Sequence, residues 1–243
     1  MANPLLKEDV FKKTSDIQGG VVYSERQTAM TISGTINKSI ILLLLLGASA
    51  AYAWSHPAIA QTLMFPALII GFILAMVNIF KPNISGIIAP IYALCEGIVL
   101  GAISLYFNNS YPGIVVNAVF LTIGVLFCML AAYRAGLLRA TPKFRKILLL
   151  SMMGIFVFYL INIVMSFFGS PLGYFGSNSQ GAVLINLVIV VIAALNFIID
   201  FDMIEQGAYR GAPKYMEWYC AFALLITLVW LYLEILRMLA RRR

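Results

Sequence analysis

The sequence predicts an all-α integral membrane protein built as a bundle of seven transmembrane helices, and three observations support this. Hydrophobic residues make up 62% of the 243 residues and charged residues 11%, whereas a soluble domain has about 45–50% apolar and about 25% charged residues. Seven apolar runs follow one another, each close to the roughly 20 residues that cross a bilayer. The charges gather between these runs. A cytosolic enzyme, a secreted disulfide scaffold and a disordered chain are therefore excluded.

Residues 1–38 are polar and are predicted to form a cytoplasmic tail. The tail carries basic and acidic side chains in similar numbers: Lys7, Lys12, Lys13, Arg26 and Lys38, with Glu8, Asp9, Asp16 and Glu25. It is not a signal peptide, because the apolar run begins too late in the chain. Met30, Ile32, Ile36 and Ile40 recur at helical spacing, which suggests that the first helix begins before residue 39.

The apolar runs occupy residues 39–54, 63–80, 84–107, 114–133, 147–168, 182–204 and 218–239. Polar or proline-containing segments separate them, which are typical breaks between helices. We therefore expect a transmembrane domain over residues 39–240, followed by the basic end 241–243. Seven spans would place those arginines outside the cell, so a last segment that enters the membrane and returns is the alternative to a seventh span.

The loops predict the orientation of the bundle. The loops after the second, fourth and sixth runs contain every loop lysine and arginine, and those after the first, third and fifth contain none. Because cytoplasmic loops retain basic residues, the N-terminus and the basic loops are predicted to be cytoplasmic.

Four acidic residues inside the runs or at their ends are the candidate functional residues: Glu96, Asp200, Asp202 and Glu234. A charge at bilayer depth is costly, so such side chains normally face the bundle interior or a water-filled path. Glu96 lies in the middle of the third run with no basic residue within helical reach. It is a candidate for an ion or proton pathway, and the alternative is a protonated side chain hydrogen-bonded between helices. The adjacent Gly97 and Gly101 would allow a close helix approach.

Asp200 and Asp202 close the sixth run. Asn196 is four residues before Asp200 and shares its helix face, whereas Asp200 and Asp202 point in different directions. Asp200 lies deeper, and burial favours its protonated form, so it is a candidate for a pH-dependent latch. Carboxylates at a cytoplasmic mouth would also attract Ca²⁺, which prefers oxygen ligands. A solvated pair at the interface is the alternative.

Glu234 lies late in the seventh run, three residues before Arg237. The two can form an ion pair along one helix, and a role for Glu234 at a pore mouth is the alternative. Phosphate-binding loops, nucleophile elbows and metal-binding clusters are missing from the sequence. We therefore expect neither an enzyme nor a resident cofactor nor a nucleic-acid partner. Cys95, Cys128 and Cys220 are expected to be free thiols.

Several segments resemble the Bax inhibitor family in its bacterial, YccA-like branch, from about Met30 to the C-terminus. They are residues 30–38 (MTISGTINK), the Glu96-Gly97 span, residues 199–207 (IDFDMIEQG) and residues 216–237 (MEWYCAFALLITLVWLYLEILR). The resemblance implies a seven-helix fold with the last helix central, and a pH-sensitive calcium leak.

In that family an aspartate of helix six pairs with an aspartate of helix seven, and an arginine of helix two engages both. Asp200 matches the first aspartate. Thr227 stands where the second would fall, and residues 63–80 contain no arginine. Asp202 or Glu96 would then have to replace the missing carboxylate.

These observations predict a cation leak channel of the bacterial cytoplasmic membrane, gated by Asp200 and Asp202. Glu96, Asn196 and Glu234 would line the ion pathway, and Asp200 and Glu96 would bind Ca²⁺ transiently. A regulator without conduction is the alternative; it would control a stress response or a membrane-bound quality-control protease and bind a membrane protein through its N-terminal tail. A proton-coupled cation antiporter is a further alternative.

Overall fold

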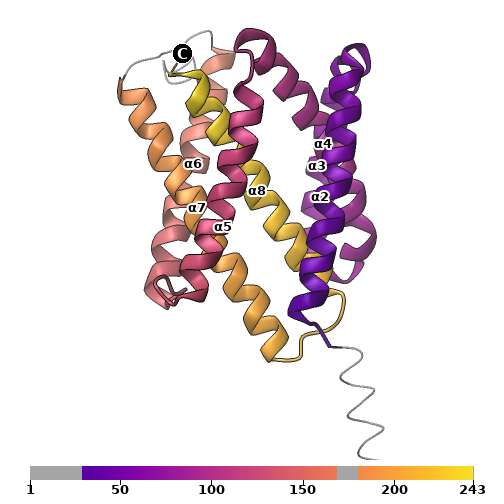
Figure 1. The fold of residues 1–243 in the computed structure, drawn as a ribbon, viewed down its shortest axis with the longest axis vertical. Coiled ribbons are helices and arrows are strands. Elements are labelled where there is room, and N and C mark those ends of the chain that lie inside the picture. Colours follow the sequence, from indigo (N-terminus) through magenta and orange to yellow (C-terminus); the bar gives the residue numbers. More distant parts are fainter. Residues whose placement is uncertain (1–28, 169–179, 243) are drawn as a thin grey trace, which may run out of the picture.

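The computed structural model describes residues 29–168 and 180–242, and seven long helices in this part run up and down side by side (Figure 1). All seven are long and apolar enough to cross a membrane, and the described residues contain no β-sheet. The predicted fold class is therefore confirmed. The helices are α2 (Ile32–Ser55), α3 (Pro57–Phe80), α4 (Ser85–Ser110), α5 (Ile114–Arg134), α6 (Pro142–Phe167), α7 (Gln180–Tyr209) and α8 (Met216–Ala240), with a 3-10 turn, η1 (Pro82–Ile84), before α4.

Three helices, α2, α3 and α6, begin before the predicted apolar runs because of the residues at their starts. The Thr31 hydroxyl accepts a hydrogen bond from the Gly34 amide at 3.0 Å, so α2 begins within the predicted tail. Pro57 and Pro142 open α3 and α6, since the fixed φ of proline suits a first turn. Residues 1–28, the rest of the predicted tail, lie outside the described residues.

The last two helices are both continuous. α7 passes through Asp200 and Asp202 and ends at Tyr209. Gly211, whose φ is +66°, lies in the short turn that follows. α8 runs from Met216 to Ala240 without a break. The last segment therefore crosses the bundle once and does not turn back.

A stripe of small residues brings α2 close to α4. Ser85, Ala89, Ala93, Gly97 and Gly101 are spaced four apart on α4, and all are buried. A Cβ atom on Gly101 would lie 2.5 Å from the Ala50 carbonyl oxygen of α2. One on Gly97 would overlap the backbone of α2 one turn earlier. The expected use of Gly97 and Gly101 for close helix approach is confirmed.

α8 is the most buried of the seven spans, with 56% of its apolar window inside the bundle. It packs against α2, α4, α5 and α7. By contrast, only 11–17% of the corresponding windows of α3, α5 and α6 is buried, so their apolar side chains point outwards. Such an outer surface fits a lipid environment. That six helices surround α8 stays a prediction.

Candidate functional site

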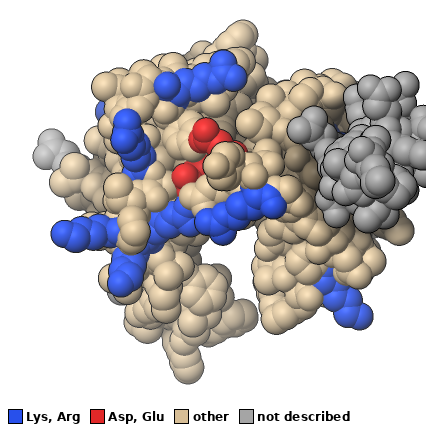
Figure 2. Space-filling view, turned by 90° about the horizontal axis from the view of Figure 1, so that it is seen from below, with Lys and Arg blue, Asp and Glu red and all other residues tan. Residues whose placement is uncertain are grey.

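Basic side chains surround one end of the bundle, where α2, α4, α6 and α8 begin and α3, α5 and α7 end. Figure 2 shows them around a small acidic patch at the centre of this face. We call this face the basic end, and its Lys and Arg residues are Lys38, Lys81, Arg134, Arg139, Lys143, Arg145, Lys146, Arg210 and Lys214. It matches the predicted cytoplasmic face, and the side of the membrane on which it lies stays a prediction.

Glu217, in the first turn of α8, holds several segments of the basic end together. Its side chain is completely buried and forms ion pairs with Lys38 of α2 and with Lys214, whose Nζ is 2.8 Å from Oε1. The backbone N–H and the hydroxyl of Thr31 each donate to Oε1 at 2.9 Å. Gly34 faces the same carboxylate, and a Cβ there would overlap it. Glu217 therefore fixes the beginning of α2 against α8.

The residues before α2 are also bound to the α7–α8 loop. The Met30 amide donates to the Ala212 carbonyl oxygen at 2.7 Å, and Ala29 forms an antiparallel bridge with Pro213. The buried Met30 side chain packs on Gly207 near the end of α7, where a Cβ would lie 2.9 Å from its sulfur. Residues 29–31 are thus held beneath α7 and α8.

Asp202 and Glu205 connect α7 to its neighbours at the basic end. The Asp202 carboxylate forms an ion pair with Arg145 of α6 and accepts a hydrogen bond from Gln206 at 2.8 Å. Glu205 accepts a hydrogen bond from the Tyr133 hydroxyl of α5. Because Arg145 is 42% exposed, the pair with Asp202 lies close to the surface.

Asp200 lies deeper, between α7 and α8. Its side chain is only 8% exposed. The Thr227 hydroxyl of α8 donates to the Ala223 carbonyl oxygen at 3.3 Å and faces the Asp200 carboxyl group, and the buried thiol of Cys220 lies near it. Its Oδ2 atom has no hydrogen-bond partner among the described residues. A buried polar atom without a partner is unusual and indicates strain or a function.

The other sequence-predicted residues lie in separate surroundings. Glu96 is half-buried where α3 meets α4; Tyr92, one turn earlier on α4, lies near its carboxyl group, and Gly71 of α3 faces it. Asn196 lies one turn from Asp200 and donates to the Ile192 carbonyl oxygen at 2.9 Å. The structure thus gives Asp200, Asp202 and Glu96 different partners, and the residue it places opposite Asp200 is Thr227.

Glu234 belongs to a polar cluster near the far end of the bundle. It is buried and accepts hydrogen bonds from Tyr159 of α6 at 2.6 Å and from Asn186 of α7 at 3.0 Å. Arg237 forms an ion pair with it at 3.0 Å, as the spacing along α8 suggests. Arg241 is also buried and donates to the Ala182 carbonyl oxygen at 3.0 Å. These contacts join the ends of α6, α7 and α8.

Sequence reasoning missed the position of Glu217. Glu205 and Glu217 fall between the sixth and seventh apolar runs, in what the sequence predicts to be a cytoplasmic loop, but Glu205 lies on α7 and Glu217 is buried in α8. The available signal was an acidic residue three positions after Lys214 at a helix start, where carboxylates are favoured. Its longer-range partners, Lys38 and Thr31, lie 179 and 186 positions earlier in the chain.

Two acidic positions therefore differ sharply in their surroundings. The Glu217 carboxylate is surrounded by cations and donors, which stabilise its charge. The Asp200 carboxyl faces the neutral Thr227 hydroxyl, and no basic side chain of the described residues acts on it. Of the two, Asp200 is the group whose protonation would change the α7–α8 contact.

No group of three or more His, Cys, Asp or Glu residues that could hold a metal occurs in the described ranges.

A family model described as "Bax inhibitor 1 like" matches residues 3–243. Neither a curated protein nor a solved structure matched the chain.

Proposed function

This chain belongs to the Bax inhibitor 1-like family, and from that premise we propose that it is a calcium leak channel controlled by protonation of Asp200. We place it in the bacterial cytoplasmic membrane with the basic end in the cytoplasm, because basic residues are retained on that side. The buried carboxyl of Asp200, with one oxygen unpartnered among the described residues, is the observation that carries this proposal.

Protonation changes what Asp200 can do between the helices. A protonated carboxyl can donate a hydrogen bond to the Thr227 hydroxyl, and a neutral pair is tolerated between packed helices. A deprotonated carboxyl leaves a charge at a buried position with no cation beside it, which is unfavourable unless water or a cation enters. Ca²⁺ is well suited to that position because it prefers oxygen ligands. We therefore expect the α7–α8 contact to loosen, and the leak to rise, as the pH rises.

The test is calcium entry into liposomes that contain the purified full chain and an internal calcium indicator, measured from acid to neutral pH. The parent should pass calcium and should do so faster towards neutral pH. Asp200→Asn cannot ionise and should show a low flux with no pH dependence. Absence of flux from the parent at every pH would refute conduction, and an unchanged pH profile in Asp200→Asn would refute the gate.

Two further variants separate Asp200 from the other candidates. Asp202→Asn removes a carboxylate two residues away that binds Arg145 near the surface, so it should keep the pH profile of the parent. If it loses that profile, the gate is the pair with Arg145. Glu96→Gln tests whether Glu96, at the α3–α4 interface, lines the ion pathway, and a flux equal to that of the parent would remove Glu96 from that pathway.

A second candidate function is a regulator that does not conduct. The supporting observation is that residues 29–31 are held under α7 and α8 by Glu217 and the α7–α8 loop, so a protein bound to the preceding tail would act directly on the basic end. Deleting residues 2–27 separates the two functions. A channel should keep its flux, whereas a regulator should lose its membrane-protein partner. A flux that requires a gradient of a second ion would instead indicate an antiporter.

A further inference from the structure

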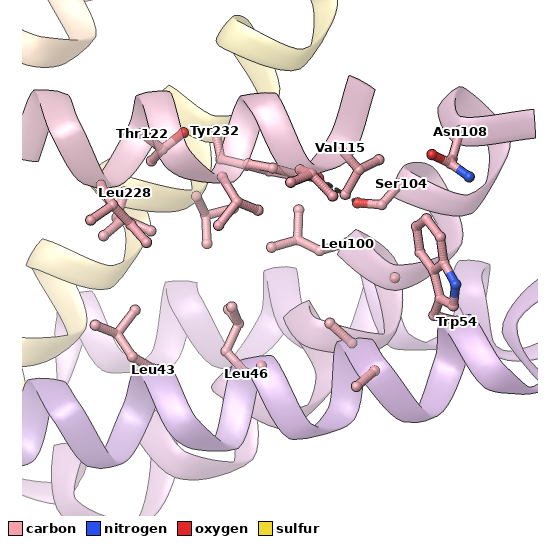
Figure 3. Close-up of a pocket in the computed structure, with 18 of the residues that line it drawn as sticks. Leu43, Leu46, Trp54, Leu100, Ser104, Asn108, Val115, Thr122, Leu228 and Tyr232 are labelled. Atoms are coloured by element: carbon pink, nitrogen blue, oxygen red, sulfur yellow. Dashed lines mark hydrogen bonds between the residues drawn. The ribbon is translucent and has the colours of Figure 1, made fainter. Parts of the chain in front are cut away.

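A long apolar groove runs between α2 and α5. Its volume is about 790 Å³, its two walls are α2 and α5, and its floor is formed by α4 and α8 (Figure 3). We call this cavity the α2–α5 groove. The volume lies within the range of about 300–1,000 Å³ that small-molecule sites usually have.

The groove has the length of one membrane leaflet. It extends along α2 from Leu43, in the middle of the helix, to Trp54 and Ser55 at its end. Leu43 and Trp54 are eleven residues apart, which corresponds to about 16 Å along a helix. Half of a hydrocarbon core is about 15 Å. The groove therefore lies in the leaflet opposite the basic end.

The groove is apolar at its deep end and more polar at its outer end, in the same order as the acyl chain and headgroup of a lipid. Leu43 and Leu228 line its deep end, and Trp54 and Asn108 lie at its outer end, near the helix termini (Figure 3). Tryptophan and amide groups are suited to the headgroup region, and leucines to the acyl region. No charged side chain lines the groove.

The hydroxyl groups inside the groove are already paired with protein atoms. Ser104 and Tyr232 on the floor form a hydrogen bond of 2.6 Å with each other, and the Thr122 hydroxyl donates to the Ala118 carbonyl oxygen at 2.8 Å. These paired hydroxyl groups therefore offer little to water, which needs two to four polar partners in a buried site. An apolar chain fills such a space with a larger gain in free energy.

We propose that the α2–α5 groove binds one acyl chain of a phospholipid from the leaflet opposite the basic end. The chain lies on the floor formed by α4 and α8, and the glycerol ester lies beside Trp54 and Asn108. Because the lining carries no charge, binding should not depend on the charge of the headgroup.

Gly47 provides a variant that fills the groove without disturbing the fold. It lines the groove on α2, and a Cβ atom added there would meet nothing within 4 Å. Gly47→Leu should therefore occupy the space of the acyl chain. Gly124 on α5 also has open space at its Cβ and is not part of the lining. Gly124→Leu makes the same change in a transmembrane helix and is the matched control.

The experiment uses the full chain in liposomes that contain a phosphatidylcholine with a photoactivatable diazirine on one acyl chain. After illumination, the labelled residues are mapped by mass spectrometry. We expect labels on Leu228, Val229 and Tyr232 of the floor, as well as on outward-facing residues such as Phe120. In Gly47→Leu the floor labels should fall about tenfold, a loss of about 1.4 kcal/mol of binding free energy. They should persist in Gly124→Leu.

Three results would overturn the inference. The first is labelling of Phe120 without labelling of the floor. The second is floor labelling that is equal in Gly47→Leu and the parent. The third is floor labelling by a diazirine fatty acid but not by the phospholipid, which would show that the occupant is a free fatty acid. Labelling of Phe120 in every variant reports correct insertion, and the outcome is independent of calcium flux.

Discussion

Glu217→Gln tests the interpretation that one buried carboxylate holds the beginning of α2 to α8. The parent carboxylate accepts from Lys38, Lys214 and two donors of Thr31. A glutamine keeps one acceptor oxygen, which can still bind Thr31. Its NH₂ group replaces the oxygen that faces Lys38, so a donor then faces an ammonium group. The variant therefore keeps the shape of the side chain and removes the ion pairs.

The expected loss of stability follows from the exposure of the partners. Removing one member of a buried ion pair costs about 3–5 kcal/mol, and exposed pairs contribute about 0–1 kcal/mol. The Glu217 side chain is completely buried, whereas Lys38 is 16% and Lys214 49% exposed. We therefore expect Glu217→Gln to lower the free energy of unfolding by about 2–3 kcal/mol, between those two limits.

The assay is unfolding of the purified protein in mixed micelles with an increasing fraction of a denaturing detergent, followed by helical circular dichroism. Asp202→Asn is the control, because its partner Arg145 is much more exposed and its loss should be at most about 1 kcal/mol. Lys38→Met and the double variant complete a mutant cycle, which should give a coupling of about 1–2 kcal/mol between contacting residues. Equal stability of Glu217→Gln and the parent, or a coupling of zero, would refute the interpretation.

Two other variants test the close contact between α2 and α4 and the hydrogen bonds around Glu234. Gly101→Ala should lower the free energy of unfolding by about 1–3 kcal/mol through overpacking, because its Cβ would lie 2.5 Å from a carbonyl oxygen of α2. Its control is Gly154→Ala on α6, where a Cβ meets nothing within 4 Å. The control should be neutral or stabilising in the same assay. Tyr159→Phe removes the hydrogen bonds of its hydroxyl with Glu234 and Arg237 and should cost about 1–3 kcal/mol, whereas Tyr106→Phe, at a side chain that is 71% exposed, should leave the unfolding midpoint unchanged.

Much of the fold could be predicted because the signals for membrane helices are local. Each span needs only a sufficient run of apolar residues, and each break needs only polar residues, glycine or proline. The number and order of the spans therefore follow directly from the sequence. The helix ends were less predictable. Thr31 and Pro142 start α2 and α6 outside the apolar runs, because capping depends on single residues and not on hydropathy.

The candidate site was only partly predictable for a different reason. Asp200 stood out because a carboxylate in an apolar run is costly wherever the chain folds. Glu234 and Arg237 could be paired from their spacing on one helix. The ion-pair partner of Asp202 could not be assigned in this way, since Arg145 belongs to α6, and neither could the approach of Gly71 of α3 to Glu96.

The sequence by itself determined that this protein resides in a membrane, crosses it seven times and carries a few costly acidic residues, since composition and local spacing suffice for these properties. Apart from the Glu234–Arg237 pair along one helix, only the tertiary structure decided which charges are neutralised. Glu217 is paired with Lys38, 179 positions away, and Asp200 faces the neutral Thr227. The free energy of a buried carboxylate depends on the groups within a few ångströms of it, and those groups come from helices that meet only in the folded bundle.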